Sequence, residues 1–260
     1  MTDDRTLKLE GVHNFRDFGG YALGQGGRLQ RGLLWRSGQH HEATDADLAQ
    51  IDALGLTRVF DLRSDRERFT HPCRRPDGFS AKIHFVEDGT AQQAPHVAAA
   101  SGPRRDAATA RENMRRSYRG MPYRPKLNEA IRTYLRALAE GEGASLVNCM
   151  AGKDRTGFAV AMVQHAAGVH FDDILADYVL TNQAGDPVAR IAAGHRATRE
   201  ILGNIDDDAL RVIMGVEPEY LETAFATIRE DHGSIDAYQR EVLELDDALR
   251  DRLRDRLGEG

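Results

Sequence analysis

The hydrophobic positions of the chain fall into short apolar runs separated by longer amphipathic stretches. Short runs at residues 33–36, 58–60, 83–85 and 145–148 predict buried strands. Between these runs, apolar residues spaced three and four positions apart predict helices, one capped by Thr44 and another beginning at Pro125. Strands that alternate with helices predict an α/β fold with a mostly parallel central sheet flanked by helices.

The second half of the chain has a different pattern, with helical periodicity almost throughout. We expect helices at residues 156–167, 172–182, 187–202, 209–214 and 218–232, then a short helix capped by Ser234 and a charged tail helix. A C-terminal half made of helices is expected to cover one side of the sheet.

Residues 87–123 do not fit the alternation of strands and helices. A stretch rich in Ala, Gln, Gly and Pro leads into a helical pattern over residues 107–118, and basic side chains outnumber acidic ones over residues 103–126. Because a long segment of this kind in a compact domain is usually a lid or an insertion, we predict a helical lid-like insertion at about residues 88–123 that covers an anionic substrate. A solvated, arginine-rich face is the alternative.

Composition and charge limit the class of protein. With 260 residues, 41% of them hydrophobic, the chain can form a single domain over residues 1–260, and its oligomeric state stays open. A formal net charge of -6 argues against nucleic-acid binding. The acidic start without an apolar core predicts no signal peptide and no stable membrane insertion, so we expect a cytoplasmic protein, with export by a signal-less route left open. Two cysteines, Cys73 and Cys149, cannot build a disulfide framework.

Residues 147–157, which read VNCMAGKDRTG, carry the clearest chemical signal. A strand, a tight loop and a helix follow one another, so the loop amides are expected to turn toward the helix N-terminus and form an anion nest. There the helix dipole, the amides and the guanidinium of Arg155 all favour a thiolate at Cys149. Arg155 can also place its planar fork on two oxygens of a phosphoryl group. The loop residues expected to bind the anion are Met150, Ala151, Gly152, Lys153 and Thr156.

The loop belongs to a wider set of motifs. The sequence contains CMAGKDRTG at residues 149–157, NFRDFGGY at 14–21, WRS at 35–37 and DLRS at 61–64. With these motifs the chain resembles the cysteine-dependent phosphatases, and more closely the bacterial tyrosine and phosphoinositide phosphatases of the tyrosine phosphatase B type. The resemblance spans most of the chain and implies the α/β fold of that superfamily. One position departs from the pattern, because Asn148 stands where the family usually has a histidine that helps to tune the thiolate.

The resemblance implies attack of Cys149 on phosphorus and a phosphocysteine intermediate that water hydrolyses, without a metal ion or another cofactor. Thr156 can donate to the sulfur. Two aspartates compete for the role of general acid. Asp154 is preferred, because a fixed negative charge inside the loop is costly unless it is protonated or turned toward the leaving group. Asp61, at the end of a strand, is the other candidate, and its simpler roles are a partner of Arg63 or a turn cap.

The expected substrates are phosphotyrosine, with extension to phosphoserine, phosphothreonine and phosphoinositides, so the expected partner is a phosphorylated protein or a phosphoinositide. Lys153 resembles the lysine that binds extra phosphates in lipid phosphatases, and a surface lysine without substrate contact is the alternative. Two other functions remain open. Asn148 is compatible with a phosphate-binding pseudophosphatase, and a cysteine loop that receives an anion also occurs in sulfurtransferases.

Overall fold

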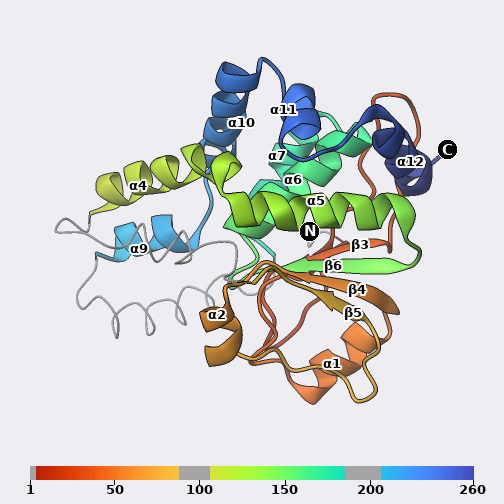
Figure 1. Cartoon of the computed structure of the whole chain (residues 1–260). Coiled ribbons are helices and arrows are strands. Elements are labelled where there is room, and N and C mark those ends of the chain that lie inside the picture. Colours follow the sequence, from red (N-terminus) through yellow and green to blue (C-terminus); the bar gives the residue numbers. More distant parts are fainter. Residues whose placement is uncertain (1–3, 88–105, 185–205) are drawn as a thin grey trace.

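A five-stranded sheet forms the centre of the computed structural model, which describes residues 4–87, 106–184 and 206–260 (Figure 1). Its order is β1-β3-β6-β4-β5, with β3, β6, β4 and β5 parallel and β1 antiparallel to β3. The predicted α/β class with a mostly parallel sheet is therefore confirmed. The strands are β1 (Arg16–Asp17), β3 (Leu34–Ser37), β4 (Leu56–Asp61), β5 (Lys82–His84) and β6 (Ala144–Asn148). A separate pair, β2 (Arg28–Leu29) with β7 (Gly258–Glu259), was not predicted and ties the C-terminus to the N-terminal region.

The strand that leads to Cys149 lies in the middle of the sheet. β6 runs between β3 and β4, and Asn148 is in register with Ser37 on one side and Asp61 on the other. Because parallel strands end at the same edge of a sheet, the segments that follow these three residues meet there. The register therefore places Cys149 between the loops that leave β3 and β4.

Helices cover both faces of the sheet (Figure 1). They are α1 (Asp45–Asp52), α2 (Asp65–Thr70), α4 (Ala107–Arg119), α5 (Pro125–Glu140), α6 (Asp154–Ala167), α7 (Phe171–Leu180), α9 (Asp207–Met214), α10 (Pro218–His232), α11 (Ile235–Glu241) and α12 (Asp247–Leu257), with a 3₁₀ turn at Met121–Tyr123. Local signals explain several ends: Thr44 and Asp47 form a capping box on α1, and Gly168 ends α6 with a left-handed φ of 99°. The predicted helical C-terminal half is confirmed where the chain is described, and the helix expected at 187–202 lies outside the described residues.

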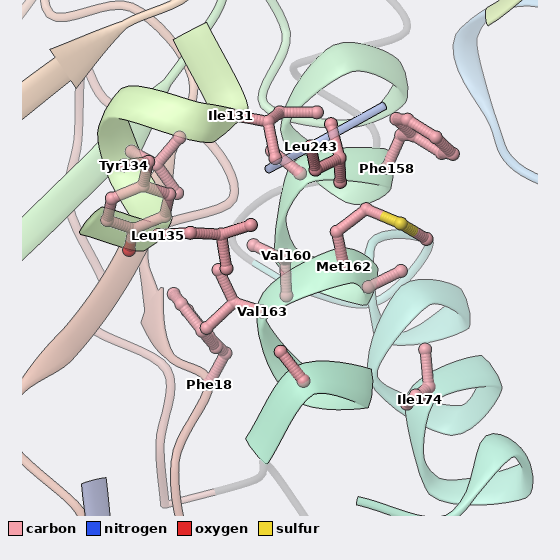
Figure 2. Close-up of a cluster of buried hydrophobic side chains, with 14 of the residues drawn as sticks. Phe18, Ile131, Tyr134, Leu135, Phe158, Val160, Met162, Val163, Ile174 and Leu243 are labelled. Carbon is pink, nitrogen blue, oxygen red and sulfur yellow. The ribbon is translucent and has the colours of Figure 1, made fainter. Parts of the chain in front are cut away.

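The main core lies between the sheet and α5, α6 and the C-terminal helices. Figure 2 shows Ile131 and Leu135 of α5 facing Val160 and Val163 of α6. Every residue of α6 except His165 is buried, so this helix is enclosed on all sides. Burying one Val, Leu or Phe side chain completely contributes roughly 1.5–3 kcal/mol to the free energy of folding, so this packing holds α6 firmly in its position. The N-terminus of α6 is thereby held at the end of the loop that carries Cys149.

The described part of the predicted insertion is a packed helix. α4 contacts α9 through a small apolar cluster that includes Ala110, Leu210 and Ile213. Two of its arginines also form ion pairs at the start of α10: Arg111 with Glu217, which precedes the helix, at 2.8 Å, and Arg115 with Glu219 at 2.7 Å. These two arginines are therefore engaged by carboxylates within the fold. Residues 88–105 lie outside the described residues, so the lid and the single domain both stay predictions.

No helix within the described ranges combines the length and the apolar character that crossing a membrane requires.

Candidate active site

The loop between β6 and α6 is held from the outside by its carbonyl groups. The Met150 carbonyl accepts from the Gln39 amide at 3.0 Å, and the Gly152 carbonyl accepts from Asn14 Nδ2 at 2.6 Å and from Arg36 Nη2 at 3.0 Å. The described peptide bonds are trans, and in a trans peptide the N–H points opposite to the C=O. The amides of Ala151 and Lys153 therefore point away from these anchors, as the predicted anion nest requires.

Gly152 is the residue that lets the loop lie this close to β3. Its φ is +65°, and a Cβ added there would lie 2.4 Å from the carbonyl carbon of Ser37. No side chain fits in that space, and few residues other than glycine adopt that φ without strain. Gly152, one of the residues expected to bind the anion, is thus also the point where the loop packs against the sheet.

Cys149 and Arg155 lie together and are both almost fully buried, with 3% and 1% exposure. Burial alone would lower the pKa of Arg155, but hydrogen bonds to Glu67 and the charge of a Cys149 thiolate outweigh it and raise that pKa above its ordinary value. Nη1 and Nη2 of Arg155 each donate to Glu67 at 2.7 Å, and Nη1 also donates to the Leu62 carbonyl at 3.0 Å. Within the described parts of the chain Nε is buried without a hydrogen-bond partner. The Nε–Nη2 edge of the guanidinium therefore still offers donors for an anion.

Glu67 was not singled out from the sequence. It is the third residue of α2 and closes a capping box with Ser64, whose amide donates to Oε2 at 2.7 Å. Burial would raise the pKa of Glu67, but the hydrogen bonds and charge of Arg155 hold it below its ordinary value. Glu67 thus fixes the orientation of Arg155. The signal that could have found it is the Ser64-x-x-Glu67 capping box directly after β4.

Asp154 begins α6 and is buried beneath two tyrosines. Tyr118 of α4 donates to Asp154 Oδ1 at 2.9 Å, and Tyr178 of α7 donates to the Tyr118 hydroxyl at 2.7 Å. Burial, followed by the charge of Asp154, raises the pKa of Tyr118 and of Tyr178 well above the ordinary value, so both hydroxyls stay protonated. This chain of hydroxyl groups fixes one oxygen of Asp154, and it reaches the loop from helices that periodicity alone did not connect with it.

Lys153 is fully buried, and its side chain points into the fold. Its ammonium is buried and donates to the carbonyls of Ile213 at 2.5 Å and Gly215 at 3.0 Å, at the end of α9. It also lies 3.4 Å from Asp154 Oδ1. A cation at the C-terminus of a helix is favoured by the helix dipole. In this conformation Lys153 therefore joins the loop to α9 instead of offering its charge to a second phosphate.

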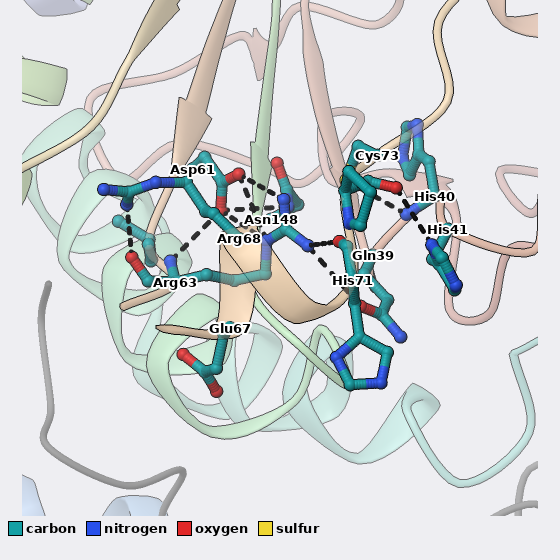
Figure 3. Close-up of polar contacts among 12 residues, drawn as sticks. Gln39, His40, His41, Asp61, Arg63, Glu67, Arg68, His71, Cys73 and Asn148 are labelled. Atoms are coloured by element: carbon teal, nitrogen blue, oxygen red, sulfur yellow. Dashed lines mark hydrogen bonds and ion pairs between the residues drawn. The ribbon is translucent and has the colours of Figure 1, made fainter. Parts of the chain in front are cut away.

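Asp61 is engaged by Arg63, which is one of the simpler roles expected for it. Arg63 Nε donates to Asp61 Oδ1 at 2.9 Å and Nη2 donates to Oδ2 at 2.7 Å, and Asn148 Nδ2 is 3.5 Å from Oδ1 (Figure 3). Asn148 thus touches the neighbouring strand end in place of the histidine of the family pattern. Cys73 lies in the same polar cluster, where its sulfur accepts from the His40 amide at 3.3 Å.

Two further polar groups near the loop are uncommitted. The Thr156 hydroxyl is buried and has no partner in the described part of the chain, so it is free to donate to the sulfur as expected. Arg124 precedes α5, and its Nη1 is likewise buried and unpartnered among the described residues, while Nη2 donates to Ser117 Oγ at 2.9 Å. Burial, and then the nearby charge of Arg155, lowers the pKa of Arg124. Arg124 is thus a second cation beside Arg155 that the sequence marked only as part of a basic segment.

The structure brings Cys149, Arg155, Asp154 and Thr156 to one loop, whereas the Asp61 carboxylate faces Arg63 and the Lys153 ammonium faces α9. Within the described ranges no set of three or more His, Cys, Asp or Glu side chains is arranged to hold a metal ion.

Comparison with known proteins agrees with this geometry. The sequence model of the tyrosine phosphatase family matches residues 7–259. The triple specificity protein phosphatase PtpB of Mycobacterium tuberculosis is 34% identical over 268 residues, covering 90% of this chain and 93% of that protein. A candidate tyrosine-protein phosphatase of Cupriavidus necator is 32% identical over 247 residues, covering 92% of this chain and 85% of the relative. The loop, the fold and these relatives agree, and the chain belongs to the tyrosine phosphatase family of enzymes.

Proposed function

We propose that this enzyme hydrolyses phosphomonoesters through a phosphocysteine intermediate on Cys149. One observation carries the proposal: the anchored carbonyls of Met150 and Gly152 leave the loop amides facing the opposite side, beside a thiol and an arginine with an uncommitted edge. Such a set of donors matches the equatorial oxygens of a phosphoryl group, whose charge spreads over those oxygens in the transition state.

In the first step the Cys149 sulfur forms a bond to phosphorus as the ester P–O bond breaks. The loop amides and the Nε–Nη2 edge of Arg155 hold the phosphoryl oxygens, and the leaving oxygen takes up a proton. In the second step water attacks phosphorus and gives a proton to the carboxylate that protonated the leaving oxygen, while the P–S bond breaks and the sulfur leaves as a thiolate. The Thr156 hydroxyl, which has no other partner in the described residues, stabilises that thiolate.

Asp154 is the proposed general acid. Its carboxyl group lies at the first turn of α6, where Tyr118 fixes Oδ1 and Oδ2 is the oxygen proposed to face the substrate. Asp61 suits this role less well, because both of its oxygens accept from Arg63. We therefore assign proton transfer to Asp154 and the positioning of Arg63 to Asp61.

The proposed substrate range begins with phosphotyrosine and extends to phosphoserine, phosphothreonine and phosphoinositides. The triple specificity named for the Mycobacterium tuberculosis relative supports a broad range. Arg124, with its unpartnered Nη1 near Arg155, is proposed to contact the substrate beside the phosphoryl group. Binding of a second phosphate by Lys153 would require its ammonium to leave the carbonyls of Ile213 and Gly215, so we rank phosphoinositides after phosphotyrosine.

The test is hydrolysis of p-nitrophenyl phosphate in the presence of a metal chelator. We expect full activity with chelator, loss of at least about 10⁴-fold in kcat for Cys149→Ser, and near-normal activity for Cys73→Ser as the matched cysteine control. Trapping of a phosphorylated Cys149 peptide after rapid acid quench identifies the intermediate. Activity that survives Cys149→Ser, or that the chelator abolishes, contradicts the proposal.

A further inference from the structure

Three charged side chains from separate elements meet in the interior behind the loop. Arg16 of β1, Arg36 of β3 and Asp177 of α7 are each fully buried. Arg36 Nη1 donates to Asp177 Oδ2 at 2.7 Å, and Arg16 Nε donates to Asp177 Oδ1 at 3.3 Å. Arg16 also donates to the Asp177 carbonyl at 2.8 Å. We call these three residues the basic clamp.

The basic clamp touches the loop directly at one peptide. Arg36 Nη2 donates to the Gly152 carbonyl at 3.0 Å, and Asn14, which accepts from Arg16, donates to the same carbonyl at 2.6 Å. A Cβ added at Gly157 in α6 would lie 3.5 Å from Arg36 Nη2, so the clamp also lies against the first turns of that helix. One carbonyl thus receives two donors, and the opposite end of its peptide is the Lys153 amide.

The charges around Cys149 are mostly paired one to one. Arg155 pairs with Glu67, Arg63 with Asp61, and Lys153 with Asp154. Arg124 adds a cation beside Arg155, and the neutral Tyr118 faces Asp154. Arg75 adds a further cation near Asp61 and Arg63, and it lies 2.9 Å from the buried His40 ring. Asn148, immediately before the nucleophile, carries no charge.

The basic clamp holds two guanidinium groups and one carboxylate. Burial would raise the pKa of Asp177, but the charges of Arg16 and Arg36 hold it below its ordinary value, so the carboxylate stays ionised. Burial and then the charge of Arg36 lower the pKa of Arg16 to about 10, which still leaves it protonated at neutral pH. The clamp therefore places one unbalanced positive charge behind the loop, in a region without solvent to screen it.

We propose that the basic clamp fixes the Gly152 peptide so that the Lys153 amide faces the phosphoryl group, and supplies unbalanced positive charge that favours the Cys149 thiolate and a bound dianion. This inference rests on the proposed function only for the bound dianion, because ionisation of the Cys149 sulfur requires no substrate. It also offers a role for the clamp beside Asn148, since the excess positive charge comes from Arg16 and Arg36, only partly neutralised by Asp177, instead of from a neighbouring imidazole.

The test uses the pH dependence of Cys149 alkylation by iodoacetamide, followed by mass spectrometry of the Cys149 peptide in a Cys73→Ser background. Arg36→Gln removes one positive charge but keeps an amide that can donate to Gly152, and Asp177→Asn removes the negative charge at nearly constant shape. We expect the midpoint of the alkylation profile to rise by about 0.5–1 pH unit in Arg36→Gln and to fall by about the same amount in Asp177→Asn.

Opposite shifts of the alkylation midpoint in Arg36→Gln and Asp177→Asn distinguish an effect of charge from an effect of loop geometry. A purely structural role predicts that both variants loosen the loop and move the midpoint the same way. Asn14→Ala is the neutral control, because it removes a donor to Gly152 and an acceptor of Arg16 without changing a charge: we expect a kcat about tenfold lower and an unchanged midpoint.

Circular dichroism and thermal melting establish which variants are folded. If Arg36→Gln does not fold, a fall of the midpoint in Asp177→Asn supports the inference, and no change or a rise overturns it. If Asp177→Asn does not fold, the inference requires the alkylation midpoint to rise more in Arg36→Gln than in Asn14→Ala. Equal midpoints in these two variants overturn the inference. Because alkylation requires no turnover, a shift seen in an enzyme that hydrolyses no phosphomonoester would overturn the proposed function alone.

Discussion

Replacement of Glu67 by Gln tests how Arg155 is held. The carboxylate accepts both Nη groups of Arg155 at 2.7 Å and the Ser64 amide at 2.7 Å. An amide of the same shape keeps one acceptor but turns an NH₂ group toward a donor, whichever way it lies. The Arg155 side chain is 1% exposed and that of Glu67 is 14% exposed, so the guanidinium would be left buried beside a neutral partner.

The expected cost follows from this burial. Removing one partner of a fully buried ion pair costs about 3–5 kcal/mol, and the partial exposure of Glu67 with its one remaining acceptor reduces this to about 2–3 kcal/mol at neutral pH. A loosened Arg155 also leaves the phosphoryl group less well oriented, and a misplacement of about 1 Å costs on the order of 10²-fold in kcat/KM.

The pH dependence provides an internal check on the sign. Since Arg155 outweighs burial and holds the pKa of Glu67 below 4.5, the ion pair contributes fully above that pH and is lost as pH falls through the lowered value. The difference in unfolding free energy between wild type and Glu67→Gln should therefore be largest near neutral pH and shrink in acid. Urea unfolding at several pH values measures it, with p-nitrophenyl phosphate kinetics in parallel.

Glu222→Gln on α10 is the matched control, because Glu222 is exposed and its replacement should change stability by less than about 0.5 kcal/mol. A Glu67→Gln enzyme that keeps wild-type kcat/KM, or a stability difference that grows as pH falls, would refute the reasoning.

Three further predictions address other parts of the site. Asp154→Asn should lose the alkaline limb of the kcat profile for an ester with a poor leaving group while Asp61→Asn keeps it, and the reverse result would transfer the role of acid to Asp61. Gly152→Ala, with φ of +65° and a Cβ 2.4 Å from the Ser37 backbone, should lower kcat by about 10²-fold or more, whereas Gly26→Ala on the surface should not; equal kinetics of the two variants would show that the loop tolerates a side chain. Arg124→Ala should raise KM for phosphotyrosine peptides about tenfold with little change in stability, while Arg119→Ala should leave KM unchanged; an unaltered KM in Arg124→Ala would exclude contact with the substrate.

Much of the fold could be predicted from the sequence because local rules determine it. The apolar run before Cys149, the Thr44 cap and Pro125 each mark an element that the structure contains close to the predicted bounds. The short pairing of β2 with β7 could not be predicted, since two-residue strands have no periodicity and form only when distant ends of the chain meet. The Cys149 loop was evident because its residue types and spacing are contiguous in sequence.

Long-range pairing explains the residues that the sequence did not reveal. Glu67 and Arg155 are 88 positions apart, and Arg36 and Asp177 are 141 positions apart. Nothing in the local pattern around Lys153 indicates that its ammonium reaches the carbonyls of α9. A charged side chain in an isolated segment is expected to face solvent, and only packing decides which opposite charge it meets.

The sequence by itself determined that a strand, a loop with Cys149 and Arg155, and a helix would follow one another, because backbone preferences and a short motif act over neighbouring residues. Only the tertiary structure decided which groups surround that loop. The sheet register brought Ser37 and Asp61 to either side of Asn148, and the position of α7 placed Asp177 within hydrogen-bond distance of Arg16 of β1 and Arg36 of β3. Burial then strengthened the electrostatic interaction within each of these pairs, because charges removed from water interact over distances at which solvent would screen them.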